Sequence, residues 1–181
     1  MNRRHFVGAL GAVTAIFNFA RPARAATLSA EARIKELGIV LPEPAGPAAV
    51  YVPFRRTGNL VFIAGQIPPQ DAGIPTVGKV GGELTVEQGY AAARLVGLRI
   101  LAQLRVACDG DLDRVVQAVQ IRGFVNCTAD FTAQPGVING VSDLLRDVFG
   151  DAGLAARAAL GTNALPLNAA VEVESIFEIR H

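Results

Sequence analysis

The sequence predicts an α/β fold in which one sheet is covered on one face by two helices. Two observations support this prediction. Residues 171–179 alternate apolar and acidic side chains with a period of two, as a half-buried strand does. Residues 85–108 and 137–150 repeat apolar side chains every three or four positions, as amphipathic helices do. Because strand-like segments surround the helical ones, the expected order is β-β-α-β-α-β-β in a two-layer sandwich.

The first 25 residues have the pattern of an export signal. Arg3 and Arg4 precede an uncharged apolar run over 6–20, and a small-x-small cleavage pattern ends at Ala25. That run is too short to span a bilayer comfortably. We expect twin-arginine export to the periplasm or the outside, a mature chain starting at Ala26, and no membrane contact after cleavage. A membrane-anchored helix and a misassigned start codon are the alternatives.

The body that follows the signal is slightly acidic. The signal contains four of the 17 basic residues and none of the 16 acidic ones, so 13 basic residues face 16 acidic ones in the rest. Its length is that of one domain with a real core. Binding of nucleic acid requires clustered Lys and Arg against phosphates, and no such cluster exists. The charge pattern therefore argues against nucleic acid as the main partner.

The mature chain is predicted to begin with a lead-in, 26–47, before the main domain, 48–181. Ser29 is placed to cap a short helix that Gly38 ends. Three prolines follow, which favour an extended connector because proline fixes φ and donates no hydrogen bond.

Two strands are predicted at the start of the domain, over 49–52 and 60–65. Residues 55–59, which include a Gly-Asn pair, are predicted to form the hairpin loop between them. Residues 69–82 are rich in glycine and proline without apolar periodicity, so a surface loop is predicted there.

The first long helix is predicted to start with a capping box at Thr85 and Gln88 and to end near Cys108. Its expected core stripe is Ala91, Leu95, Leu98, Ala102 and Val106. A strand over 112–125 and a loop precede the second helix. The core stripe expected for that helix is Val137, Val141, Leu144 and Val148. Two strands, separated by a Leu-Pro pair, close the chain.

The two cysteines, Cys108 and Cys127, flank the predicted strand 112–125. An extended strand rises about 3.3 Å per residue, so the strand ends lie on the order of 40 Å apart. A disulfide needs Cα atoms within about 7 Å of each other. We therefore predict no intrachain disulfide, although the expected compartment is oxidising.

Several kinds of chemistry are disfavoured by the residues present. The only histidines are His5, in the signal, and His181, the last residue, which argues against Ser-His-Asp and Cys-His arrangements and against zinc sites of the His and Cys type. Neither nucleotide-binding glycine motif occurs in a suitable context. We therefore expect no cofactor and no metal, and chemistry that uses Arg, Glu, Tyr and water.

Two motifs, in this order, carry a resemblance to a known family. The first is Tyr51 followed by GNLVFIAGQIP at 58–68, and the second runs from Ala156-Arg157 through Leu165-Pro166 to 171–174, VEVE. Together they are similar to the conserved segments of the RidA/YjgF family over about 51–179. The resemblance implies a chorismate-mutase-like fold, assembled as a homotrimer with clefts between subunits.

The resemblance also implies roles for two charged residues. Arg157 matches the arginine that holds the substrate carboxylate, and a planar guanidinium suits a small 2-imino acid. A structural ion pair to Glu172 or Glu174 is the alternative. Glu172 matches the glutamate that positions the attacking water and accepts its proton. A solvated strand face is the alternative for Glu172.

Five further positions belong to the expected substrate-binding site. Tyr51 matches the tyrosine that closes the pocket, or else it is a wall residue with a satisfied hydroxyl. Gly65 permits close approach of a ligand, or a tight strand end. Asn139 matches a helix asparagine, or is an ordinary polar residue near a helix start. Ala64 and Ala159 occupy positions where the family usually has serine and cysteine, which lowers the polarity of the pocket.

Three functions remain open at this point. The first is hydrolysis of enamines or imines, such as 2-aminoacrylate and 2-iminopropanoate, to a 2-keto acid and ammonia. The second is a trimer that binds an exported carboxylate ligand without turnover. The third is RNA cleavage, which is also attributed to this family and which the acidic body disfavours.

Overall fold

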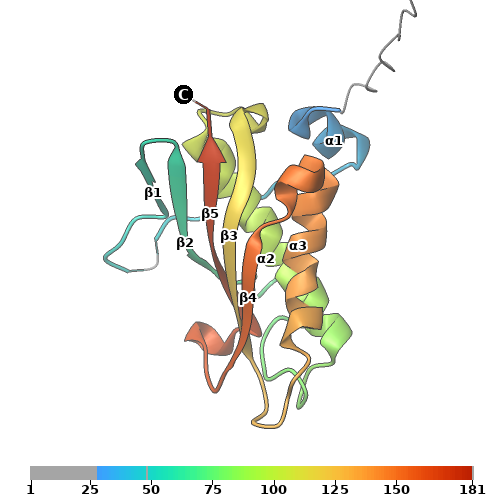
Figure 1. Ribbon diagram of the computed structural model, residues 1–181. Coiled ribbons are helices and arrows are strands. Elements are labelled where there is room, and N and C mark those ends of the chain that lie inside the picture. The colour runs from blue at the N-terminus through green and yellow to red at the C-terminus, as the bar shows by residue number, and fades with distance from the viewer. Residues whose placement is uncertain (1–27, 48, 181) are drawn as a thin grey trace, which may run out of the picture.

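A computed structural model describes residues 28–47 and 49–180. The predicted export signal lies outside the described residues. A five-stranded sheet forms one layer of the molecule, and helices pack on one of its faces (Figure 1). The strands are β1 (Phe54–Thr57), β2 (Leu60–Gln66), β3 (Val115–Asn126), β4 (Ala156–Thr162) and β5 (Val171–Ile179), arranged in the order β1-β2-β5-β3-β4. Only β3 and β4 pair in parallel; the other neighbours in this sheet are antiparallel.

The helices are α1 (Ala30–Glu36), α2 (Val86–Ala107) and α3 (Gln134–Phe149). Three short 3₁₀ turns, η1 (Leu112–Arg114), η2 (Gly150–Gly153) and η3 (Pro166–Asn168), connect the longer elements. The expected β-β-α-β-α-β-β order of the domain, with two helices on one face, is confirmed.

The core lies between the sheet and the pair α2 and α3. In β5 the predicted alternation holds, because every second residue from Val171 to Ile179 is buried against the helices. The helices approach closely at Gly140, where an added Cβ would lie 2.2 Å from the backbone oxygen of Tyr90. Only glycine fits there. The predicted stripe of α3 is buried in full.

The predicted stripe of α2 is wrong. Val106 is 49% exposed, and of the five predicted residues only Ala102 is buried. The apolar residues that α2 buries are Ala92, Ala93, Val96, Ile100, Leu101, Ala102, Leu104 and Ala107. The helix is apolar around most of its circumference and packs on both α3 and the sheet. Several three- and four-residue repeats therefore fit its sequence, and only packing selects one of them.

The first hairpin also differs from the prediction. Residues 49–52 form no strand, whereas 54–57, most of which was expected in the loop, form β1. Thr57 pairs with Leu60, so the turn consists of Gly58 and Asn59 alone, with Gly58 at φ 53°. Arg55 and Arg56 pair as strand residues because only two residues are needed to reverse the chain.

The other boundaries differ less. The strand predicted over 112–125 begins after the η1 turn and runs on to Asn126. The capping box at Thr85 and Gln88 is present, and Ser29 caps α1. Cys108 and Cys127 are both free and buried, which confirms that no disulfide joins them.

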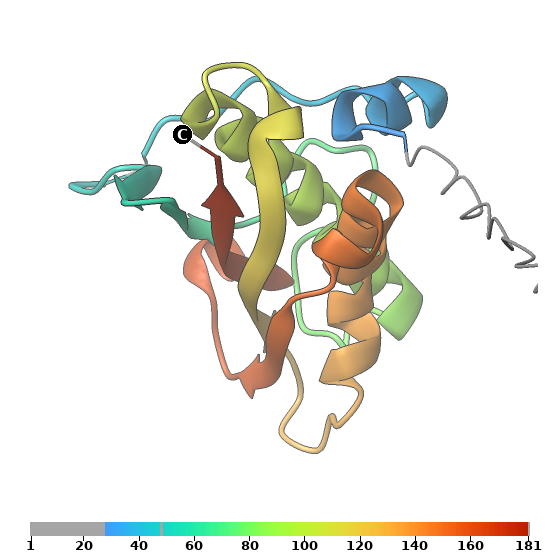
Figure 2. The same ribbon diagram turned by 45° about the horizontal axis from the view of Figure 1, so that its top comes forward.

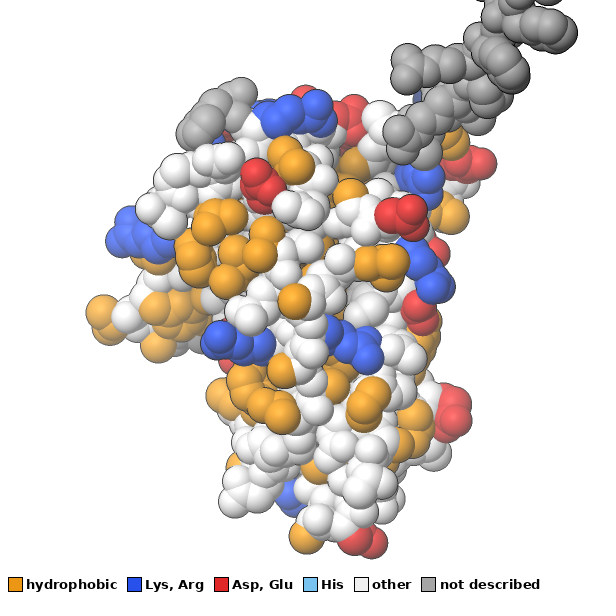
Figure 3. Space-filling view, viewed as in Figure 1, with side chains coloured by type: hydrophobic (Ala, Val, Ile, Leu, Met, Phe, Trp, Pro, Cys, Tyr) orange, Lys and Arg blue, Asp and Glu red, His pale blue; other side chains and the backbone are white. Residues whose placement is uncertain are grey.

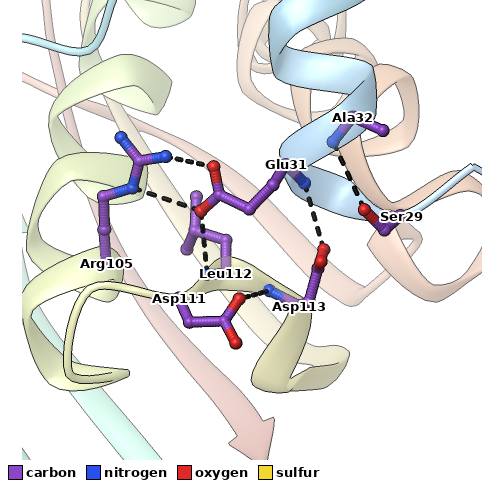
Figure 4. Close-up of polar contacts among 7 residues, drawn as sticks. All are labelled: Ser29, Glu31, Ala32, Arg105, Asp111, Leu112 and Asp113. Carbon is purple, nitrogen blue, oxygen red and sulfur yellow. Dashed lines mark hydrogen bonds and ion pairs between the residues drawn. The ribbon is translucent and has the colours of Figure 1, made fainter.

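The lead-in packs on the domain. Ala30 and Ile34 of α1 are part of the single core cluster, and the chain then runs from α1 past α2 towards β1 (Figure 2). Glu31 fixes this arrangement: its carboxylate accepts from Arg105 and from the backbone N–H of Leu112, and its own N–H donates to Asp113 (Figure 4). Segments more than 70 residues apart in the sequence are thereby held together.

Candidate functional site

Glu172 lies on the open face of the sheet, at the side of a cavity of about 510 Å³. Its position in β5 follows from the alternation that buries Val171 and Val173 on the helical side. The end of β2, the lead-in, α2 and η3 supply the other walls. The polar and glycine residues of these walls are Gly46, Tyr51, Gly65, Gln66, Gln70 and Arg99. The remaining wall is largely proline and aliphatic, as in many small-molecule sites.

Gly65 leaves the space that the Glu172 carboxyl group occupies. A Cβ added to Gly65 would lie 2.0 Å from Oε1 of Glu172. The two residues face each other across the β2–β5 ladder, which is irregular between Ile63 and Gln66. The small residue at position 65 therefore determines where the carboxyl group sits.

The electrostatics of Glu172 differ from those of a solvated surface carboxylate. Partial burial raises its pKa, and the nearby negative charge of Glu174 raises it further. A carboxyl group with a raised pKa is a better proton acceptor once ionised, because its conjugate acid is weaker. The environment thus suits proton transfer to and from a bound water or substrate.

Two walls of the Glu172 cavity are fixed by one face of α2. Nη1 of Arg99 donates to the backbone oxygen of Ile67 at 3.2 Å, which holds the segment after β2. One turn later, Nε2 of Gln103 donates to the backbone oxygen of Ala45 at 2.6 Å, which holds the lead-in. Residues four apart lie on the same side of a helix. The helix thereby sets the width of the cavity.

Arg157 lies elsewhere, on β4 at the edge of the sheet. Its Nη1 donates to Oδ1 of Asn139 at 2.8 Å and to Oγ of Ser142 at 2.9 Å, both on α3. Within the described residues it has no carboxylate partner, and Glu174 pairs with Arg122 instead at 3.0 Å. The ion-pair alternative for Arg157 is therefore wrong for the single chain. Asn139 contacts Arg157 directly, which the sequence resemblance alone left uncertain.

One chain does not bring Arg157 and Glu172 into one cleft. Arg157 is in register with the buried Ile121 on β3, whereas Glu172 is in register with Phe124, three residues on. An odd separation along a strand places side chains on opposite faces. Arg157 therefore belongs to the helical face and Glu172 to the open face.

The two alanines of the expected site also separate. Ala64 lines a second hollow on the open face, of about 400 Å³, beside the ion pair of Arg122 and Glu174. Ala159 is in register with Gly123 on the helical face and packs against the core. Tyr51 and Gly65 line the Glu172 cavity itself.

The open face of the sheet carries exposed apolar side chains. Figure 3 shows them gathered in patches over the strands, with basic side chains between the patches. Phe62 is 40% and Leu160 50% exposed, and both lie on this face by their register. No helix of the described residues covers this side of the sheet.

Neither a metal-binding cluster nor a membrane-spanning helix is found among the described residues. No group of three or more His, Cys, Asp or Glu residues in that part of the chain is placed to hold a metal ion. Over the same residues, no helix combines the length and apolarity required to cross a membrane.

Arg99, Gln103 and the lead-in wall of the cavity were not predicted from the sequence. Their signal was present: Arg99 and Gln103 are polar residues four apart in a helix otherwise rich in apolar ones. A stripe placed one residue further along α2 would have included both Arg99 and Gln103 in the face that packs on neighbouring segments.

Comparison with known proteins agrees with this geometry. The family model described as "YjgF/chorismate_mutase-like, putative endoribonuclease" matches residues 31–179. Protein TCP17 of Trypanosoma cruzi is 43% identical over 151 residues, which span 83% of this chain and 94% of that protein. The match to the family model begins within α1 and includes the connector as well as the sheet.

Solved structures lead to the same conclusion. Atu1372 of Agrobacterium tumefaciens, described as having unknown function, is 42% identical with a TM-score of 0.76, over 83% of this chain and 92% of that one. A Shewanella oneidensis protein described as "a putative endoribonuclease" is 34% identical with a TM-score of 0.79, over 84% of this chain and 100% of that one. RidA from a Psychrobacter species, at 24% identity and a TM-score of 0.50 over 76% and 94%, shares the fold.

The five-stranded sheet, the helices α2 and α3 on one of its faces and the Glu172 cavity together define a chorismate-mutase-like α/β protein. The chain belongs to the RidA/YjgF family, the YjgF/chorismate mutase-like proteins.

Proposed function

We propose that this protein hydrolyses reactive 2-imino acids and their enamine tautomers to 2-keto acids and ammonia. The observation that carries the proposal is Glu172: a half-buried carboxyl group with a raised pKa, in a cavity of small-molecule size. Hydrolysis of an imine needs a base for water and an acid for the departing nitrogen, and one carboxyl group can serve both steps in turn.

The steps balance without a redox partner. Glu172 accepts a proton from water as the water oxygen bonds to the C=N carbon, and the π electrons of that bond move to nitrogen. Glu172 returns this proton to nitrogen, which gives a carbinolamine. It then takes the proton of the new hydroxyl group and delivers it to nitrogen, so that ammonia leaves as the C–N bond breaks and the C=O bond forms. The imine and water thus become the keto acid and ammonia.

Arg157 is proposed to hold the substrate carboxylate from an adjacent copy of the chain. Asn139 and Ser142 already fix its guanidinium, so little side-chain entropy remains to be lost on binding. Since Arg157 and Glu172 lie on opposite faces of one sheet, the proposal requires a site between copies. A homotrimer packed through the exposed apolar side chains of the open face is the assembly we propose, in keeping with the family resemblance.

The test uses the mature protein, 26–181, and 2-iminopropanoate generated in situ by an amino-acid oxidase. Faster imine decay that Arg157→Ala abolishes would support the proposal, with Arg146→Ala as the control because Arg146 makes an exposed ion pair on α3. No acceleration from a protein that sediments as a trimer would refute the enzyme and favour the carboxylate-binding alternative.

Cleavage of RNA is the third candidate, because the descriptions of the matching family model and of the Shewanella oneidensis protein both include the word endoribonuclease. A labelled RNA incubated with the same preparation provides the comparison. Cleavage that survives Glu172→Gln but tracks protein concentration would favour it over imine hydrolysis.

A further inference from the structure

The Glu172 cavity contains a cation of its own chain, Arg99. This residue reaches the cavity from the middle of α2. Arg99 is half-buried, and its Nη1 is fixed by the backbone oxygen of Ile67. A guanidinium has five N–H donors. Most of the hydrogen-bonding capacity of Arg99 is therefore left for a ligand.

No carboxylate of the described residues forms an ion pair with Arg99. Glu172 lines the same cavity, yet burial and Glu174 account for its raised pKa, with no opposing contribution from Arg99. A guanidinium in contact with Glu172 would lower that pKa. Glu172 and Arg99 thus line one cavity without forming an ion pair with each other.

The surroundings favour an anion at Arg99. The neighbouring wall is formed by Ile67, Pro68 and Pro69, and Leu167 closes it from η3. Apolar walls keep water away and strengthen the attraction between a guanidinium and a carboxylate. The guanidinium fork also matches the two oxygens of a carboxylate.

We propose that Arg99 binds a second acidic group of the substrate, so that the preferred 2-imino acids are those with an acidic side chain. The inference rests on the proposed function, in which Arg157 of an adjacent copy takes the carboxylate next to the C=N carbon. The substrate is then held at both ends, with its reacting carbon opposite Glu172. Arg99 acts as a specificity-determining residue, since it touches the part of the substrate that does not react.

The experiment compares two imines made in situ by amino-acid oxidases, one from glutamate and one from alanine. The wild-type protein should accelerate decay of the acidic imine at least tenfold more, per active site, than that of the alanine imine. Arg99→Gln should lower the ratio of the two accelerations, acidic imine over alanine imine, at least tenfold. The matched control is Arg94→Gln, five residues earlier on α2, where the side chain pairs with Asp147 instead.

Equal loss for both imines in Arg99→Gln would overturn the inference and would make Arg99 a general substrate or structural residue. No loss for either imine would also overturn it, while leaving the proposed hydrolysis intact. Thermal unfolding of each variant excludes a folding defect as the cause.

A binding measurement separates this inference from the proposed activity. Glutarate and propanoate are unreactive and have the carbon chain lengths of the two imines, and only glutarate has a second carboxylate. Calorimetry should show glutarate binding at least tenfold more tightly than propanoate, and Arg99→Gln should abolish the difference. That result would support the acidic subsite even if neither imine were hydrolysed. Equal binding of the two acids by the wild type would refute the subsite whatever the activity.

Discussion

Oε1 of Glu172 occupies the place where a side chain at Gly65 would begin, since the two positions are 2.0 Å apart. The glycine of β2 and the carboxyl group of β5 therefore act as one unit. Position 65 requires glycine because a side chain there would displace the Glu172 carboxyl group. The backbone at Gly65 does not have a positive φ, so the local conformation itself does not require glycine.

Gly65→Ala should displace the Glu172 carboxyl group and keep the fold. The group that must move is the end of a flexible side chain, so the cost is small compared with a clash against backbone. Imine hydrolysis should fall by about two orders of magnitude, as expected for a misplaced acid-base group. The control is Gly46→Ala in the same cavity, where an added Cβ meets nothing within 4 Å. Equal activity of both variants would show that the position of Glu172 is unimportant.

Glu172→Gln should lower activity and raise stability at neutral pH. Because the folded pKa is raised, the native state binds more protons than the unfolded state between the two pKa values. The free energy of unfolding of the wild type therefore declines as pH rises through that window. The amide does not titrate, so its advantage in Tm should be present at pH 7 and vanish below about pH 4. An advantage that is constant with pH would contradict the burial argument.

Asn139→Ala should weaken substrate binding through Arg157. Loss of one hydrogen bond to a charged group costs about 1.5 kcal/mol, or roughly tenfold, when the group must be ordered again on binding. KM for 2-iminopropanoate should rise more than kcat falls, since the chemistry at Glu172 is untouched. Arg146→Ala, on an exposed part of α3, should leave both constants unchanged. An unchanged KM in Asn139→Ala would show that the contact does not orient Arg157.

Glu31→Ala should destabilise the domain by about 2 kcal/mol, because the N–H of the buried Leu112 loses its acceptor and Arg105 loses its partner. Urea unfolding measures the change. Glu36→Ala, at the exposed end of the same helix, is the control and should change stability by less than about 0.5 kcal/mol. Equal effects in the two variants would mean that α1 contributes only helix propensity.

Cys108 should resist thiol reagents in the native protein. Burial raises the pKa of its thiol to about 11. At pH 8 the reactive thiolate is then only about one thousandth of the population, and the residue has no exposed surface. Both cysteines should react together when urea unfolds the chain. Rapid modification of Cys108 below the unfolding transition would disprove the tight packing at the end of α2.

Much of the fold could be predicted from the sequence, since its signals are local. The alternation in β5 and the capping box of α2 each lie within a few residues and are confirmed by the structure. The α2 stripe could not be fixed in this way, because a helix that packs on two layers has apolar residues on several sides. β1 depended on a two-residue turn that leaves little trace in hydrophobicity.

The residues of the candidate site also divide into those with a local sequence signal and those without one. Tyr51, Gly65 and Glu172 were found by motif, and the structure brings them around one cavity. The placement of Arg157 and Glu172 on opposite faces of the sheet could not be predicted, because it depends on strand register. A register shift of one residue moves a side chain to the other face. Arg99 is visible in the sequence as a polar residue of an apolar helix, but the distant segments that it and the lead-in contact are not, because a single sequence does not show such contacts.

The clamp at Glu31 also bears on the order of folding. Its partners, Arg105, Leu112 and Asp113, follow it by 74 to 82 residues, so α1 leaves the ribosome long before anything exists for it to dock on. Its contacts close a long loop of the chain, and the entropy cost of closing such a loop precedes any gain from the contacts. We therefore expect α1 to dock late, although it is synthesised before its partners, and the lead-in wall of the Glu172 cavity to form with it.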